Sequence, residues 1–280
     1  MKKSIKHVTI IFLLVIFCFL GEVSYAKTIG ILSALPAEIE NLKTEITKQE
    51  EVSKGIIKGE IGPHTVYATL SGIGKVNAAA TAQKLISEYK IDILIFSGVA
   101  GGINPTFNIG DVVLVSQAFQ HDFGYLGEEF KIHAVGTLPE IGIGTGNESI
   151  YFDLSLFWQK EVLADIQNSA AEFSKSFVSV QVNDKEYSPD LKLNGIVATG
   201  DQFLANDAKK QYLRDHKADI VEMEGGAVAQ IAQKNRVPCL ILRSISDKSD
   251  EEADINFQQF FTIVAKNNSA LVAYLIKNMP

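Results

Sequence analysis

Short runs of apolar residues alternate along the chain with longer segments in which apolar residues recur at helical spacing. The apolar runs predict β-strands at residues 28–34, 55–61, 65–70, 91–96, 112–115, 195–198, 220–221 and 239–242. Helical spacing predicts helices at residues 77–89, 154–171, 207–215, 225–234 and 257–277. Buried strands that are mostly followed by a loop or a helix are typical of a largely parallel sheet with helices on both faces.

Residues 127–149 do not follow this pattern. They are rich in glycine and show neither strand nor helix periodicity, which predicts a long surface loop or flap rather than a domain boundary. Because no linker-like segment separates the remaining elements, we expect residues 27–280 to form one domain.

The first 26 residues have the order of features expected of an export signal. Lys2, Lys3 and Lys6 precede an uncharged, mostly apolar run over residues 8–20, and Ser24-Tyr25-Ala26 then places small residues at −3 and −1. The run is short for a bilayer-spanning helix, which needs about 20 residues. We therefore expect residues 1–26 to be removed and the mature chain to be periplasmic, with no membrane attachment. An uncleaved N-terminal anchor is the alternative.

The composition narrows the possible partners. Hydrophobic residues make up 46% of the chain and charged residues 21%, which excludes disordered and collagen-like proteins. The formal net charge of −7 argues against nucleic acid as a partner, because no broad basic face would neutralise phosphates. A small pocket that binds a nucleoside remains compatible with this charge. The five histidines are scattered and no paired metal-ligand motif occurs, so we expect neither a metal nor a cofactor.

Polar residues that directly follow predicted strands are the candidate site residues. In open α/β sheets, ligands bind outside the carboxyl ends of the strands. The residues in such positions are Glu38, the segment 97–102, Asp201, Glu222, Glu224 and Asp247.

The acids Glu222 and Glu224 lie where a predicted strand meets a helix of small residues. In extended backbone both side chains point the same way, and a carboxylate can accept two hydrogen bonds from the cis-diol of a ribose. The alternative is that both are helix-start acids stabilised by the helix dipole.

Two further acids have alternative interpretations. Asp247 could donate a proton to a ring nitrogen, or it could cap a following helix, as could Ser246. Glu38 could activate a water molecule, or it could be a solvated acid in the first turn of a helix. The glycines of segment 97–102 would allow close approach of a ligand to the backbone, but taken alone they favour a tight turn.

Seven segments, taken in order, resemble one enzyme family, the 5′-methylthioadenosine/S-adenosylhomocysteine nucleosidases of the purine nucleoside phosphorylase superfamily. The resemblance extends from about residue 28 to residue 277. The segments are Ile29-Gly-Ile-Leu-Ser-Ala-Leu-Pro-Ala-Glu38, Ser71-Gly-Ile-Gly-Lys-Val-Asn-Ala-Ala79, Ser97-Gly-Val-Ala-Gly-Gly102, Gly110-Asp-Val-Val, Ala198-Thr-Gly-Asp-Gln-Phe203, Val221-Glu-Met-Glu224 and Arg243-Ser-Ile-Ser-Asp247.

This resemblance implies a three-layer α/β/α domain around a twisted mixed sheet, usually assembled as a homodimer. It implies hydrolysis of an N-glycosidic bond, which releases adenine from a thioribose nucleoside. By position, Asp247 resembles the acid that protonates purine N7, and Glu38 resembles the base that orients the attacking water. The substrate-binding residues that the resemblance implies are Gly101, Phe203, Leu204, Met223, Glu224 and Ser246, and the strand-end pattern adds Glu222.

Three alternatives stay open. A phosphate-dependent purine nucleoside phosphorylase would need cations near the first strand, where Glu38 would repel phosphate. An exported nucleoside-binding protein without turnover would not need a water-orienting base. The same chemistry could also act on a different nucleoside, such as a futalosine-type nucleoside or inosine.

Overall fold

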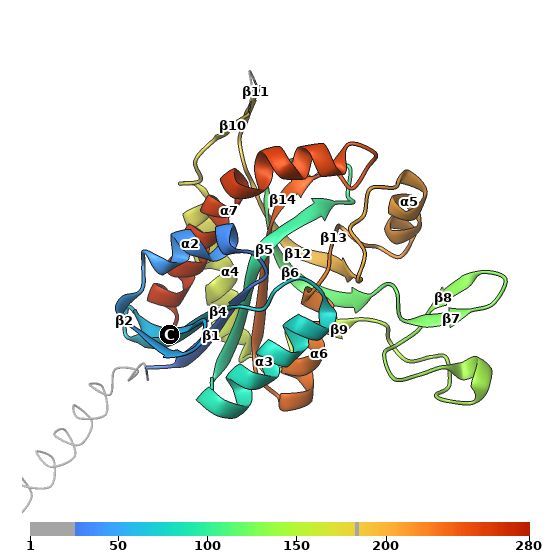
Figure 1. The fold of residues 1–280 in the computed structure, drawn as a ribbon, viewed down its shortest axis with the longest axis horizontal. Helices are drawn as coiled ribbons and strands as arrows, with labels where there is room; N and C mark the ends of the chain where they lie inside the picture. The colour runs from blue at the N-terminus through green and yellow to red at the C-terminus, as the bar shows by residue number, and fades with distance from the viewer. Residues whose placement is uncertain (1–25, 183–184) are drawn as a thin grey trace, which may run out of the picture.

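A ten-stranded mixed β-sheet forms the centre of the computed structural model, which describes residues 26–182 and 185–280 (Figure 1). The sheet order is β13-β12-β6-β14-β5-β1-β4-β3-β2, and the short β9 pairs with β6. The strands are β1 (Thr28–Ser33), β2 (Thr47–Ser53), β3 (Ile56–Ile61), β4 (His64–Leu70), β5 (Ile93–Gly102), β6 (Val112–Gln120), β9 (Phe152–Asp153), β12 (Leu191–Thr199), β13 (Ile220–Glu222) and β14 (Cys239–Asp247).

Parallel pairing in the middle of this sheet brings distant parts of the chain together. Strand β1 pairs in parallel with β4 and β5, and β5 pairs in parallel with β14. The neighbouring β6 is antiparallel to β14, so the sheet is mixed. Because parallel strands end at the same edge, the segments that follow β1, β5 and β14 meet there.

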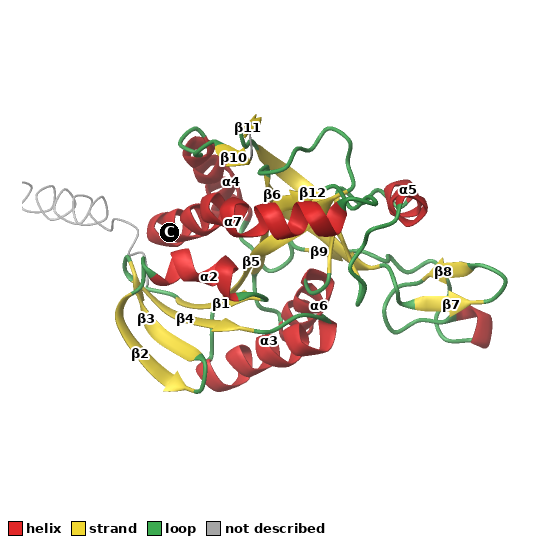
Figure 2. Cartoon of the chain, turned by 45° about the horizontal axis from the view of Figure 1, so that its top comes forward, coloured by secondary structure: helices red, strands yellow, loops and turns green. Residues whose placement is uncertain are grey.

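Helices cover both faces of the sheet (Figure 2). One face carries α2 (Pro36–Lys43), α4 (Lys160–Ser174) and α7 (Ala253–Asn278), and the other carries α3 (Lys75–Tyr89) and α6 (Gly225–Asn235). The short α5 (Asp207–Asp215) lies beyond the end of β13.

The side chains of β5 show how the layers are held. Ile93 and Ile95 pack in one apolar cluster with Leu271 of α7, whereas Leu94 and Phe96 pack in the other cluster with Ala82 of α3. Successive side chains of a strand point to opposite faces, so a strand covered on both sides must be almost continuously apolar. The predicted three-layer α/β/α architecture with a mixed sheet is confirmed.

Some predicted elements have different bounds in the structure. Strand β5 continues through Gly102, so the interpretation of segment 97–102 as a tight turn is wrong. Strand β14 likewise continues through Asp247, and α4 begins at Lys160, six residues later than predicted. Strand β2 was not predicted, because nearly all of its side chains are exposed and no apolar alternation marks it.

Residues 124–149 form an arm that projects from the body of the molecule (Figure 1). The arm contains β7 (Gly124–Leu126), β8 (Phe130–Ile132) and a 3₁₀ turn at Pro139–Ile141, and residues 139–149 are almost entirely exposed. A second small hairpin joins β10 (Val180–Val182) to β11 (Lys185–Tyr187). The prediction of a surface loop or flap over residues 127–149 is confirmed by the exposed arm.

The N-terminal export signal that the sequence predicts lies outside the described residues. Within residues 26–182 and 185–280, no helix has both the length and the apolar character needed to span a membrane. Cys239 is buried in the core cluster, and burial raises the pKa of its thiol to about 12.

Candidate active site

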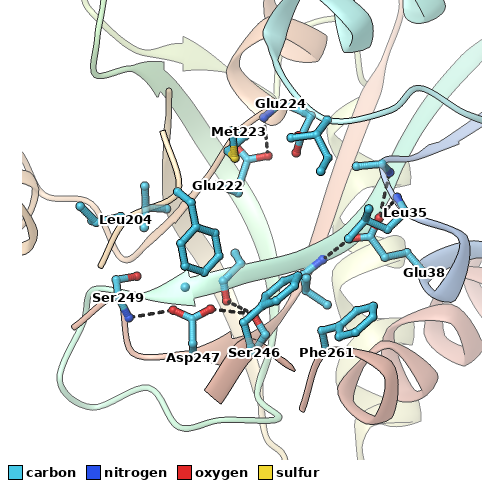
Figure 3. Close-up of a pocket in the computed structure, with 18 of the residues that line it drawn as sticks. Leu35, Glu38, Leu204, Glu222, Met223, Glu224, Ser246, Asp247, Ser249 and Phe261 are labelled. Atoms are coloured by element: carbon cyan, nitrogen blue, oxygen red, sulfur yellow. Dashed lines mark hydrogen bonds between the residues drawn. The ribbon is translucent and has the colours of Figure 1, made fainter. Parts of the chain in front are cut away.

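A cavity of about 540 Å³ lies at the sheet edge where β1, β5 and β14 end. Figure 3 shows that Glu38, Glu224 and Asp247 border this cavity from different sides. All nine site residues expected from the sequence line it: Glu38, Gly101, Phe203, Leu204, Glu222, Met223, Glu224, Ser246 and Asp247. The structure therefore brings together residues that are distributed along most of the chain.

Asp247 is the last residue of β14 and is only 3% exposed. Its Oδ1 atom accepts a hydrogen bond from the backbone N–H of Ser249 at 2.8 Å, and its Oδ2 atom accepts one from the hydroxyl of Ser246 at 2.8 Å. Burial raises the pKa of this carboxyl, and the two hydrogen bonds oppose part of the rise. Because α7 begins only at Ala253, the alternative that Asp247 or Ser246 caps a helix is wrong.

Glu38 is 2% exposed, so the alternative of a solvated first-turn acid is wrong. Its Oε2 atom accepts hydrogen bonds from the N–H groups of Ala34 at 2.8 Å and Leu35 at 2.7 Å. Its Oε1 atom accepts one from the N–H of Val99 at 3.0 Å. Burial raises the pKa of Glu38, while the nearby Arg243 and the three N–H donors act in the opposite direction. The carboxyl is thereby fixed between the loop after β1 and the strand β5.

Arg243 is fully buried behind the cavity wall. Its guanidinium group donates a hydrogen bond to Glu222, lies 3.4 Å from Glu224 and covers the ring of Phe96 at 4.0 Å from the centroid. Gly98 makes room for this arrangement, because a Cβ atom there would overlap the guanidinium and lie 2.7 Å from an oxygen of Glu38. The positive charge of Arg243 is therefore paired with the carboxylates of Glu222 and Glu224.

Both oxygens of Glu222 are occupied by protein donors. One accepts a hydrogen bond from the hydroxyl of Thr199, and the other accepts the N–H groups of Glu224 at 3.0 Å and Gly225 at 2.6 Å, in addition to Arg243. Gly225 is the first residue of α6, so Glu222 partly fills the helix-start role that was its alternative. This side chain fixes the turn that presents Glu224 to the cavity.

Glu224 has a different environment from Glu222. Its Oε1 atom accepts a hydrogen bond from the N–H of Gly74, in the loop before α3, at 2.9 Å. Burial and the neighbouring Glu222 raise the pKa of Glu224 to about 7, although Arg243 acts against the rise. Its carboxyl oxygens accept one backbone N–H and the long 3.4 Å contact from Arg243, which leaves acceptor capacity for a ligand.

Aromatic side chains form one wall of the cavity. Phe203 is 49% exposed and meets the ring of Phe257 edge-on, with ring centroids 5.5 Å apart. Phe257 stacks on Phe261 with ring centroids 4.9 Å apart. Phe257 and Phe261 were not predicted as site residues, because apolar residues four apart at the start of a helix also predict an ordinary apolar face. Leu35, Ile73 and Ser249 also line the cavity and were not predicted.

Asp201, which also follows a strand, does not line the cavity. Its side chain accepts a hydrogen bond from the N–H of Lys75 at 2.8 Å, at the start of α3. Its own N–H donates to Asp122, which forms an ion pair with the ammonium group of Lys75. Among the residues that the structure describes, no group of three or more His, Cys, Asp or Glu side chains could hold a metal ion.

Comparison with known proteins identifies the family. The model of the phosphorylase superfamily matches residues 28–277, which include every element of the site. The chain belongs to this superfamily. Within the superfamily, the expected resemblance to 5′-methylthioadenosine/S-adenosylhomocysteine nucleosidases is also confirmed.

Relatives in the phosphorylase superfamily match over nearly their whole length. A 5′-methylthioadenosine/S-adenosylhomocysteine nucleosidase from Staphylococcus carnosus is 29% identical, covering 90% of this chain and 100% of the relative. An aminodeoxyfutalosine nucleosidase from Campylobacter jejuni is 32% identical, covering 90% and 99%. The crystal structure of the Neisseria meningitidis methylthioadenosine/adenosylhomocysteine nucleosidase with methylthio-immucillin-A superposes with a TM-score of 0.72 at 27% identity, covering 90% and 99%.

Proposed function

We propose that this member of the phosphorylase superfamily hydrolyses the N-glycosidic bond of 5′-methylthioadenosine/S-adenosylhomocysteine-type nucleosides and releases adenine and a thioribose. The observation that carries the proposal is the convergence of Glu38, Glu224 and Asp247 on one cavity, whose lining among the described residues includes no Lys, Arg or His. Cleavage of the C1′–N9 bond builds positive charge on the ribose and negative charge on the leaving base. Carboxylates near the sugar stabilise the first charge, and an acid near the purine neutralises the second.

Asp247 acts as the general acid that protonates N7 of the purine. The raised pKa of its buried carboxyl favours the protonated form that this role requires. The hydroxyl of Ser246 and the N–H of Ser249 hold the two carboxyl oxygens and so fix the direction of proton transfer. Adenine offers an acceptor at N7 directly beside its 6-amino group, so an acid at this position both binds and activates the base.

Glu38 acts as the base that orients the attacking water. Three backbone N–H donors fix its carboxyl, so it approaches the substrate in one geometry. The ribose hydroxyls bind to Glu224, and Met223 contacts the sugar. The purine stacks on Phe203, and the backbone beside Leu204 reads its edge. In this proposal the cleaved bond lies between Glu38 and Asp247.

The principal competing function is that of a phosphorylase. Dependence of the reaction on inorganic phosphate distinguishes phosphorolysis from hydrolysis. Phosphate would need a cation that faces the cavity, whereas Arg243 is buried against Glu222 and Glu224. We expect adenine release from 5′-methylthioadenosine to proceed at the same rate with and without added phosphate. The assay measures free base by chromatography, with S-adenosylhomocysteine, adenosine and inosine as parallel substrates.

The outcomes of this assay separate the alternatives. Strict dependence on phosphate would overturn hydrolysis in favour of phosphorolysis. Absence of any released base at saturating nucleoside would instead favour a binding protein without turnover. A futalosine-type nucleoside belongs in the same panel, because the Campylobacter jejuni relative is an aminodeoxyfutalosine nucleosidase.

We further propose that the mature chain is exported and forms a homodimer. The charged, apolar and small-residue order of residues 1–26 supports export to the periplasm. Two exposed apolar side chains support the dimer: Ile73, which lines the cavity and is 51% exposed, and Val76, which is 79% exposed, because a second copy would cover them. Native mass spectrometry of the periplasmic protein should give two chains that each begin at Lys27. A mass of one chain would contradict the homodimer. A chain that retains residues 1–26 would contradict removal of the export signal.

A further inference from the structure

One hydroxyl in the cavity wall has no role in the function proposed above. The side chain of Ser249 is 0% exposed and lines the cavity, and its Oγ atom has no hydrogen-bond partner among the described residues. Ser249 also has φ of +54°, a left-handed conformation that is uncommon for residues other than glycine. A buried polar group without a partner costs free energy, so its retention at a ligand site points to a partner supplied by the ligand.

The neighbouring backbone places this hydroxyl beside the proposed general acid. The N–H of Ser249 donates to Asp247, so the two side chains leave adjacent points of one turn. Gly101 makes room for both, because a Cβ atom at position 101 would overlap the Oγ of Ser249 and lie 2.7 Å from an oxygen of Asp247. The hydroxyl of Ser249 and the carboxyl of Asp247 therefore lie side by side in the cavity wall.

The position of Ser249 relative to the other acids indicates which part of a purine it meets. Figure 3 shows Ser249 and Leu204 on one side of Asp247, and Glu38 on the opposite side. In a purine nucleoside, N7 lies between the glycosidic N9 and the substituent on C6. A purine whose N7 faces Asp247, and whose sugar lies toward Glu38, therefore directs its C6 substituent toward Ser249.

We infer that Ser249 is a specificity-determining residue whose hydroxyl forms a hydrogen bond with the exocyclic group on C6 of the bound purine. This inference rests on the proposed function, since it takes the orientation of the base from Asp247. A hydroxyl both accepts and donates, so it accepts a hydrogen bond from a 6-amino group and can donate one to a 6-oxo group. The contact recognises the C6 substituent, in addition to the contacts of the purine with Asp247 at N7 and with the backbone beside Leu204.

The test compares the binding of adenine with that of unsubstituted purine, which lacks the exocyclic group. Calorimetry measures both bases with the wild-type chain and with Ser249→Ala. One hydrogen bond contributes about 0.5–1.5 kcal/mol, which corresponds to about a 2- to 12-fold change in Kd. We expect Ser249→Ala to weaken adenine by this factor and to leave purine unchanged. Ser249→Gly, which also relieves the left-handed backbone, should give the same difference.

The matched control is Ser244→Ala. Ser244 is also a fully buried serine whose hydroxyl has no hydrogen-bond partner in the described part of the chain, but it lies inside β14 and does not line the cavity. The control should bind both bases as the wild type does. Equal weakening of adenine and purine in the Ser249 variants, or no change in either, would overturn the inference while leaving hydrolysis intact. Absence of adenine release from 5′-methylthioadenosine by the wild-type chain would instead overturn the proposed function, and the inference with it, whereas wild-type hydrolysis without any binding of adenine would overturn the inference alone.

Discussion

Replacement of Asp247 by asparagine should lower kcat for adenine release by about 10²- to 10⁴-fold, the usual contribution of a general acid. The amide has the same shape, and its oxygen can still accept the N–H of Ser249. The Ser246 hydroxyl can rotate to accept from the new NH₂ group, so the fold should persist. Only the transferable proton is lost. Initial rates of adenine release and a thermal unfolding curve measure both effects.

The pH profile provides an independent check on this assignment. Burial raises the pKa of Asp247, so the wild-type rate should fall as pH increases through that raised value. The asparagine variant should lack this alkaline limb. Asp254→Asn is the matched control, because Asp254 is exposed in the first turn of α7. A wild-type rate in the Asp247→Asn variant would contradict the role of general acid.

Replacement of Glu38 by glutamine should reduce kcat by a similar factor, while a non-hydrolysable nucleoside analogue should still bind. The amide oxygen can accept the N–H groups of Ala34 and Leu35, but its NH₂ group would then face the N–H of Val99. Two donors that face each other cost free energy, so the melting temperature should also fall. Steady-state rates, analogue titration and thermal unfolding separate these effects.

Glu40→Gln is the control for this substitution, since Glu40 lies on the same helix with an exposed side chain paired to Lys43. It should retain both rate and stability. A Glu38→Gln variant that turned over substrate at the wild-type rate would show that water is activated elsewhere. Loss of analogue binding together with activity would assign Glu38 to binding rather than to water activation.

The architecture could be predicted because the central strands are buried on both faces of the sheet. Strands in this position must be apolar at nearly every residue, and such runs are visible in the sequence. Residues 93–96 are apolar at every position, and the structure divides them between the two helical layers. Strand β2 could not be predicted in this way, because an exposed edge strand is held by backbone pairing with β3. The pattern of apolar and polar side chains in the sequence does not indicate this backbone pairing.

The site could be predicted as a set of residues, but its internal contacts could not. Strand-end positions were sufficient to collect Glu38 and Asp247, because β1 and β14 run parallel to β5 and end at one edge. Glu224 reaches the same edge differently, because it follows β13, which pairs antiparallel with the last residues of β5. Sequence did not indicate that Arg243 would be buried against both glutamates, since that contact depends on the missing side chain at Gly98. Phe257 could not be predicted as a lining residue for a related reason. The loop after β14 determines where α7 begins, and therefore which side chains of α7 face the cavity.

The buried position of Arg243 also limits how this scaffold could change its chemistry during evolution or in engineering. A shift from water to phosphate as the nucleophile would require a cation at the cavity surface. Releasing Arg243 for that purpose would remove the cationic partner of the buried Glu222 and Glu224, and breaking a buried ion pair destabilises a fold by about 3–5 kcal/mol. A gain of phosphorolysis through Arg243 would therefore demand replacements at Glu222 and Glu224 as well.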